Sequence, residues 1–212
     1  MVAITGTSEA GDTRLALEAL REEAKRCRRC PLWKPATQTV FGEGSSEAAL
    51  LFVGEQPGDQ EDLVGRPFVG PAGQLFDRAL ADAGIERART YVSNAVKHFK
   101  FEPRGKRRIH ARPNAGEIEA CRWWLDHERA LIQPKVVVAL GATAARSLLG
   151  KVVTVSRARG RLVALPDGSQ GFVTIHPSFL LRIPEEDRKA EEYRRFVHDL
   201  REVRKLAAER TG

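Results

Sequence analysis

The sequence lacks the features of a membrane protein and of a disulfide-stabilised secreted protein. Its 212 residues contain no apolar run near the roughly 18 residues that a membrane span needs. Residues 1–13 show no basic segment followed by an apolar one, so we expect no secretion signal. Three cysteines are too few for a disulfide framework. These absences predict a cytoplasmic protein that does not cross a membrane.

Internal repeats, low-complexity tracts and domain linkers are also missing. A chain of 212 residues with 42% hydrophobic and 30% charged residues can bury a core as one unit. We therefore predict a single domain over 1–212, with 1–12 as a flexible tail, and a monomer.

Positive charge is concentrated in one segment. The formal net charge is +7, and the segment from Lys97 to Arg112 holds seven Lys/Arg and one Glu, a local balance of +6. This segment is broken by Pro103 and Gly105, so we expect a loop. A basic loop favours a phosphate-rich partner over a merely solvated surface, although the second interpretation stays open.

Apolar runs alternate with amphipathic segments along the chain. The runs 48–54, 90–96, 135–141 and 171–175 have the length of strands buried on both faces. Helices are predicted over 13–25, 117–133, 142–149 and 189–209, with one more opening at Gly70 and stopped by Gly84. Residues 152–165 suggest a hairpin beside the sheet. The pattern predicts an α/β fold, a three-layer α/β/α sandwich around a central four-stranded parallel sheet.

Polar residues follow the predicted strands, at the edge where parallel sheets bind ligands. They are Glu55, Gln56, Asn94, Gly141 and His176. A carboxylate and histidines at such an edge, here Glu55 with His110 and His176, can activate a nucleophile and stabilise a leaving group. A loop histidine or a helix-capping carboxylate remains the simpler interpretation of each residue alone.

The cysteine spacing suggests a metal centre. Cys27 and Cys30 form a C-x-x-C motif, Cys121 is the third candidate ligand, and His98 is the natural fourth. Spacing alone leaves zinc and an iron–sulfur cluster equally open. Cys121 also fits an ordinary core position on its helix.

Four motifs, taken with the cysteine spacing, resemble the iron–sulfur branch of the uracil-DNA glycosylase superfamily. They are Gly54-Glu55-Gln56-Pro57-Gly58, Pro67-Phe68-Val69-Gly70-Pro71-Ala72-Gly73, Ser93-Asn94-Ala95-Val96-Lys97 and His176-Pro177-Ser178. The resemblance covers about Cys27 to Arg182. The chain departs from that branch at His98, where a cysteine is expected, and in an insertion containing Lys106-Arg107-Arg108-Ile109-His110. Both departures resemble the X-type uracil-DNA glycosylases.

The resemblance implies a function on uracil-containing DNA, single- or double-stranded. It implies that Asn94 reads the edge of a flipped uracil, that Phe68 stacks on it and that Gln56 lines the pocket. His176 is implied to hydrogen-bond O2 as negative charge develops. The implied DNA contacts are Lys106, Arg107, Arg108, Ser178, Leu180 and Arg182, with Leu180 and Leu181 in a wedge loop.

For the X-type proteins the resemblance further implies covalent trapping. His110 attacks C1′ of the sugar, with Glu55 accepting or orienting its proton, and a stable protein–DNA bond results. The implied cofactor is a structural 4Fe-4S cluster held by Cys27, Cys30, His98 and Cys121, with zinc as the alternative. Two other functions remain open, namely a conventional turnover iron–sulfur glycosylase and a non-catalytic, metal-stabilised DNA-binding module.

Overall fold

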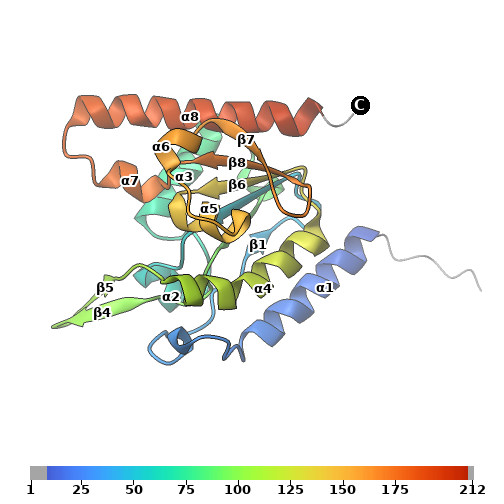
Figure 1. Ribbon diagram of the computed structural model, residues 1–212, viewed down its shortest axis with the longest axis vertical. Helices are drawn as coiled ribbons and strands as arrows, with labels where there is room; N and C mark the ends of the chain where they lie inside the picture. Colours follow the sequence, from blue (N-terminus) through green and yellow to red (C-terminus); the bar gives the residue numbers. More distant parts are fainter. Residues whose placement is uncertain (1–8, 210–212) are drawn as a thin grey trace, which may run out of the picture.

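The computed structural model describes residues 9–209, and a mostly parallel β-sheet forms its centre (Figure 1). Within these residues the sheet has six strands, in the spatial order β1 (Glu43–Gly44), β3 (Tyr91–Asn94), β2 (Leu50–Gly54), β6 (Val136–Leu140), β8 (Gln170–Thr174) and β7 (Arg161–Ala164). The four inner strands run parallel, and the two edge strands are antiparallel to their neighbours. The predicted four-stranded parallel sheet is confirmed, and an antiparallel strand extends it on each side.

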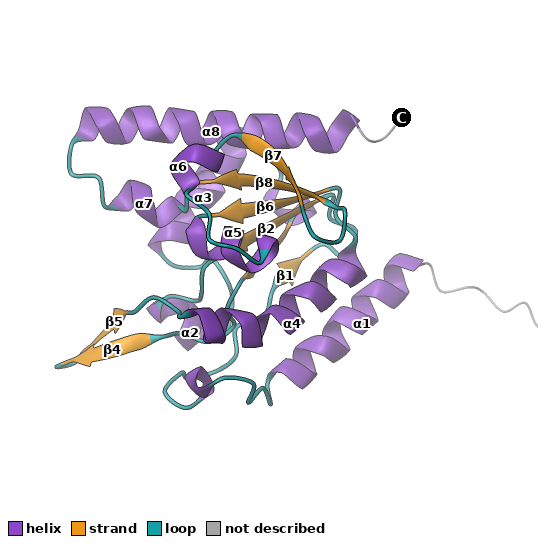
Figure 2. Ribbon diagram, viewed as in Figure 1, coloured by secondary structure: helices purple, strands orange, loops and turns teal. Residues whose placement is uncertain are grey.

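Helices cover both faces of the sheet, giving the predicted three layers (Figure 2). One face carries α3 (Pro71–Asp82), α7 (Pro177–Leu181) and α8 (Glu186–Glu209). The other carries α4 (Ala115–Ile132) and α5 (Ala142–Leu149), with α1 (Glu9–Ala24) beside α4. Short elements occupy the connections: η1 (Pro31–Trp33), α2 (Asp59–Val64), η2 (Arg87–Arg89) and α6 (Val155–Ala158). No helix among the described residues is long and apolar enough to span a bilayer.

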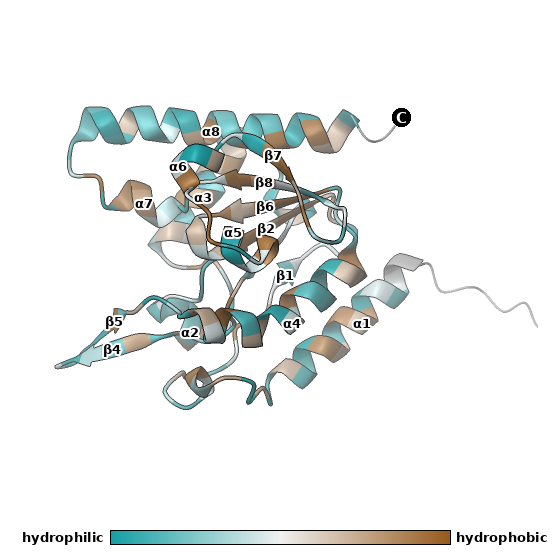
Figure 3. Cartoon of the chain, in the orientation of Figure 1, coloured by the Kyte–Doolittle hydropathy of each residue, from teal (hydrophilic) through white to brown (hydrophobic). Residues whose placement is uncertain are grey.

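The strands form because their side chains are apolar on both sides. Successive side chains of a strand point to opposite faces. Phe52 of β2 joins a core with Phe76 of α3 and Phe196 of α8, whereas its neighbour Val53 joins a second core with Leu125 of α4. Strands β2, β6 and β8 are accordingly mostly hydrophobic, while much of α8 is hydrophilic (Figure 3).

The basic segment is a β-hairpin and not the predicted loop. Strands β4 (Phe101–Arg104) and β5 (Arg107–His110) pair antiparallel and project away from the sheet (Figure 1). The turn between them is closed by Gly105, whose φ of 57° lies in the left-handed region that glycine tolerates. His110 pairs with Phe101, at the base of the hairpin.

Three further predictions need correction. Helix α1 begins at Glu9, so 9–12 are helical and not a tail, while 1–8 lie outside the described residues. Residues 152–165 do not form a hairpin of their own, because β7 pairs with β8. Helix α2 was not predicted, since its six residues are too few to show a helical period.

Candidate active site and metal centre

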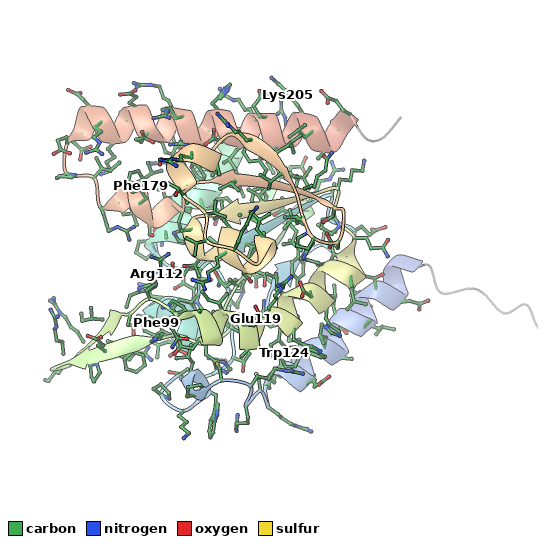
Figure 4. The ribbon with its side chains drawn as sticks, in the orientation of Figure 1. Phe99, Arg112, Glu119, Trp124, Phe179 and Lys205 are labelled. Carbon is green, nitrogen blue, oxygen red and sulfur yellow. The ribbon has the colours of Figure 1, made fainter. Side chains whose placement is uncertain are left out.

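A cleft of about 1100 Å³ lies at the carboxyl ends of the parallel strands. It brings together six residues predicted from the sequence: Glu55, Gln56, Phe68, Asn94, His110 and His176. Arg112 and Phe179, labelled in Figure 4, also line it. Ligands of parallel α/β sheets bind at this edge, so the cleft is the candidate active site.

Glu55 follows β2 and is held by two partners. Thr143 Oγ1 in the first turn of α5 donates to Oε2 at 2.6 Å, and His110 Nε2 lies 3.3 Å from Oε1. Burial by itself raises the pKa of Glu55, but the hydrogen bonds from His110 and Thr143 outweigh it and lower the pKa below its usual value. Glu55 is therefore an anion at neutral pH, beside a half-exposed histidine whose proton it can accept.

His176 is held as a neutral imidazole. It caps α7, and its Nδ1 accepts the backbone N–H of Ser178 at 3.1 Å. The ring proton must then sit on Nε2. Burial lowers the pKa of His176 to about 4. His176 thus presents an uncharged N–H donor in the cleft.

Asn94 ends β3 and faces the cleft with a free amide. No protein group within residues 9–209 hydrogen-bonds its side chain, although that side chain is buried. Gly54 of the adjacent β2 makes room for it, because a Cβ there would lie 2.3 Å from Asn94 Oδ1. One donor and one acceptor are thus available side by side for a ligand.

Phe68 forms an aromatic wall in a strained backbone conformation. Its φ of 58° is in the left-handed region, which is unfavourable for a bulky residue. Gly73 permits this geometry, because a Cβ at Gly73 would lie 1.8 Å from the Phe68 carbonyl oxygen. The Phe68 ring centre is 6.1 Å from that of His176. Strain at a cleft-lining aromatic indicates that its position serves the site.

Gln56 lines the cleft as expected, and its amide also holds the hairpin. Its Nε2 donates to the carbonyls of Lys100 and Ala111, and its Oε1 accepts the N–H of Lys100. Lys100 directly precedes β4, and Ala111 directly follows β5. Gln56 therefore closes the base of the hairpin next to Glu55, which sets the distance between Glu55 and His110.

Arg108 is also engaged within the protein. Its guanidinium pairs with Asp59 at 2.6 Å and with the buried Asp62 at 2.5 Å, and lies over the Phe99 and Phe101 rings. The predicted DNA contact is thus anchored to α2 instead. Lys106 and Arg107 are exposed and make no ion pair among the described residues, so their charges are free.

The predicted wedge requires one correction. Leu180 is 1% exposed and packs in the core, whereas its neighbour Leu181 is 44% exposed and lines the cleft. A buried leucine cannot enter a DNA duplex. Ser178 and Arg182 both line the cleft, with Arg182 Nη1 3.3 Å from Ser178 Oγ.

The four predicted metal ligands are buried between α1, η1 and α4. Cys27, Cys30 and Cys121 share one core cluster, and His98 adjoins Thr39 beside it. Residues 9–209 contain no group of three or more His, Cys, Asp or Glu side chains that could hold a metal ion as they stand. Whether these four residues fit a metal group therefore depends on which of their donor atoms have no partner within the protein.

His98 has a nitrogen that lacks a protein partner. Thr39 Oγ1 donates its single hydrogen to the Ala24 carbonyl, so His98 Nε2 must donate to Thr39 Oγ1, 2.9 Å away. The lone pair of His98 Nδ1 is then buried with no hydrogen bond. A bare imidazole nitrogen oriented by a hydrogen bond on its other side is the usual state of a metal-binding histidine.

The cysteine sulfurs also receive the hydrogen bonds expected of thiolates. Trp124 Nε1 donates to Cys27 Sγ and the Lys97 N–H donates to Cys121 Sγ, each at 3.1 Å. Burial raises the pKa of Cys30 and raises that of Cys121 to about 12, so a cation is needed to hold both as thiolates. Three soft thiolates and one imidazole fit an iron–sulfur cluster or zinc.

Some of these supporting residues could not be predicted. Thr143, Thr39 and Trp124 act through hydrogen bonds to residues distant in the chain, and nothing in their local sequence marks them. The ion pair between Lys97 and Glu128 was missed for the same reason.

Comparisons with known proteins show the family of this chain. The family model described as the uracil DNA glycosylase superfamily matches residues 41–201. A type-4 uracil-DNA glycosylase of Thermotoga maritima is 39% identical over 182 residues, covering 85% of this chain and 88% of that protein. One from Sulfurisphaera tokodaii is 34% identical over 200 residues, covering 91% and 85%. A type-5 uracil-DNA glycosylase of Pyrobaculum aerophilum is 29% identical over 180 residues, covering 76% and 75%. With a family match across most of its length and relatives above 30% identity, the chain belongs to the uracil-DNA glycosylase superfamily.

Proposed function

We propose that this protein excises uracil from DNA and then becomes covalently bonded, through His110, to the abasic sugar. Excision is supported by the type-4 uracil-DNA glycosylases that it resembles. The observation that carries the trapping step is the position of His110, 3.3 Å from the ionised Glu55 in the cleft. The inserted hairpin carries this histidine, as in the X-type proteins that the sequence resembles.

The base is read by residues on separate strands. A uracil inside a duplex must be extruded before it can enter the cleft. Its O4 can accept a hydrogen bond from the Asn94 Nδ2 amide, its N3–H can donate to Asn94 Oδ1, and the Phe68 ring supplies a stacking surface. Arg112, Arg182, Lys106 and Arg107 supply positive charge for the DNA backbone.

The cleavage step uses His176 on the leaving group. As the C1′–N1 bond breaks, its electron pair moves into uracil and the sugar takes on oxocarbenium character. The neutral His176 donates its N–H to O2, where the charge accumulates. The negative charge of Glu55 stabilises the positive charge that develops on the sugar.

The trapping step places His110 where water would attack. A neutral imidazole has one nitrogen with a lone pair, which forms the bond to C1′, and one N–H, which loses its proton to Glu55. The departing uracil anion takes up a proton, so charges balance. An imidazole bonded to carbon is a poor leaving group, and the adduct persists.

A structural 4Fe-4S cluster on Cys27, Cys30, His98 and Cys121 completes the proposal. It is supported by the donor set and by the unpartnered His98 nitrogen. Bound there, it supplies a cross-link between α1 and α4. The colour and visible absorbance of the purified protein distinguish a cluster from zinc.

The decisive experiment is a denaturing gel after incubation with a uracil-containing oligonucleotide. The parent protein should give a heat- and detergent-resistant adduct, whereas His110→Ser should release uracil without one. Arg104→Ser, at an exposed position of the paired strand β4, is the matched control and should keep the adduct. If the parent protein releases free uracil without any adduct, it is a turnover glycosylase. If it gives neither uracil nor adduct, it is a DNA-binding module. An undiminished adduct with His110→Ser overturns the nucleophile assignment.

A further inference from the structure

A buried ion pair lies directly beneath the cleft and takes no part in lining it. Lys97 Nζ and Glu128 Oε2 are 2.5 Å apart, and both side chains are 0% exposed. Burying two charges is costly and is tolerated only where further hydrogen bonds satisfy them. The partners of this pair therefore indicate what it holds in place.

The ammonium group of Lys97 binds the end of β3. It donates to the Asn94 carbonyl oxygen at 2.9 Å and to Ser93 Oγ. Asn94 is the residue whose free amide faces the cleft. Its backbone is thus fixed from below by a charged donor, which makes a stronger hydrogen bond than a neutral one.

The carboxylate of Glu128 accepts hydrogen bonds from several surrounding residues. Its Oε1 accepts the N–H of Gly42 at 2.9 Å and Tyr91 Oη at 3.1 Å, and its Oε2 accepts Ser93 Oγ at 2.7 Å. Tyr91 and Ser93 belong to β3, so Glu128 ties this strand to α4. Every acceptor position of the carboxylate is used.

The same lysine contacts the metal centre through its backbone. The Lys97 N–H donates to Cys121 Sγ, and Cys121 lies on α4 two turns before Glu128. Two separate contacts, one through each end of Lys97, therefore join the strand that carries Asn94 to the helix that carries Cys121.

We propose that Lys97 and Glu128 are positioning residues for uracil recognition, which hold Asn94 in register with the ligand-bearing helix α4. The proposal rests on the proposed function, because it assumes that Asn94 reads the base. The side-chain ion pair and the backbone contact of Lys97 make separate contributions. The side-chain pair sets the affinity for uracil, and the backbone contact to Cys121 stays intact when that pair is removed.

The test compares Lys97→Met/Glu128→Gln, which removes both charges together, with Arg129→Met. Arg129 is the next residue of α4 and pairs with Asp126 and Asp167, away from the cleft. The readout is the inhibition constant of free uracil against excision, because this constant does not depend on the fraction of active protein. It should rise about tenfold in the double variant, as expected for loss of a charge-assisted hydrogen bond, and stay constant in Arg129→Met.

Ser93→Ala serves if the double variant does not fold, since it removes only the hydroxyl between the two charges. It should raise the inhibition constant by about threefold. In protein stripped of metal, amide exchange over 93–97 should also speed up in these variants and not in Arg129→Met. A folded variant with the parent's inhibition constant overturns the proposal. A parent protein that releases no uracil instead contradicts the proposed function itself.

Discussion

Individual residues around the base-binding part of the cleft have little freedom to change. Phe68 keeps a left-handed backbone only because Gly73 lets its carbonyl approach, and Gly54 makes room for Asn94. His176 is fixed in one tautomer by a backbone N–H. The proposed recognition of uracil therefore depends on glycines and backbone groups as much as on the side chains that line the cleft.

Gly73→Ala tests the strain at Phe68. The added Cβ would lie 1.8 Å from the Phe68 carbonyl, so the loop must shift, at a cost of about 1–3 kcal/mol in unfolding free energy. We expect weaker uracil inhibition together with this loss. Gly116→Ala is the control, because Gly116 is an exposed position near the start of α4 with only one atom, at 3.5 Å, near its added Cβ. Equal stability of the two variants in denaturant melts would contradict the strain.

His176 should make the stability depend on pH. Its pKa is about 4 in the folded protein and near 6.5 when unfolded, so acid favours the unfolded chain. Its neutral-state contribution is fully present above pH 6.5 and is lost as the pH falls toward 4. Because the ring borders an open cleft, we expect a loss of about 1–2 kcal/mol. His176→Gln should flatten this part of the pH profile of urea melts, and an unchanged slope would refute the assignment.

At the scale of elements, the hairpin β4–β5 is held to the body by side chains and not by the main sheet. Gln56 closes its base, and Arg108 ties β5 to Asp59 and Asp62 near α2. Gln56 directly follows Glu55, and Arg108 lies two residues before His110. These contacts bear on the placement of His110 rather than on base recognition.

Arg108→Ala should separate trapping from excision. Without the ion pairs from Arg108 to Asp59 and Asp62, the hairpin is held less firmly and His110 is positioned less well. Adduct formation should therefore slow by about tenfold. Uracil release should change less than twofold, because Asn94 and His176 are untouched. Arg104→Ala, at an exposed position of β4, is the control. A rapid-quench assay that scores free uracil and adduct together checks this, and an equal fall in both rates would contradict it.

The sequence predicted the buried elements better than the exposed ones. Runs such as 135–141 are apolar enough to predict buried strands. The polar residues that directly follow these runs predicted the position of the cleft. The hairpin was missed because Pro103, Gly105 and a local net charge of +6 resemble a loop, whereas contacts with Phe99 and α2 stabilise the pairing. Leu180 was misassigned because in a five-residue helix the sequence does not reveal which leucine faces inward.

At the scale of the whole molecule, the protein has two structural centres. The parallel sheet and its helices form one, and the cysteine cluster between α1, η1 and α4 forms the other. Lys97 and Glu128 connect them. Changes in the metal centre should therefore affect α1 and α4 first and the sheet last.

Removal of the metal group by chelation should show this order. Hydrogen exchange should increase over 20–39 and 115–125, which carry the three cysteine ligands and their neighbours, because buried sulfurs and the His98 nitrogen lose their partner. Strands β2, β6 and β8 should keep their protection. Thr39→Val should cause the same pattern at lower chelator concentration, since it frees the His98 ring. Uniform exchange across the chain would contradict the separation.

The burial of the four ligands has a consequence for biogenesis. Cys27, Cys30, His98 and Cys121 are 5%, 7%, 3% and 2% exposed, and of the four only Cys27 lines a surface pocket, so a group bound by all four could enter only while this region is open. It has to be delivered while 25–39 is still apart from α4, before the buried imidazole nitrogen and thiols close on one another. Timing relative to folding, and not affinity alone, should then decide how much of the protein in a cell carries the proposed metal group.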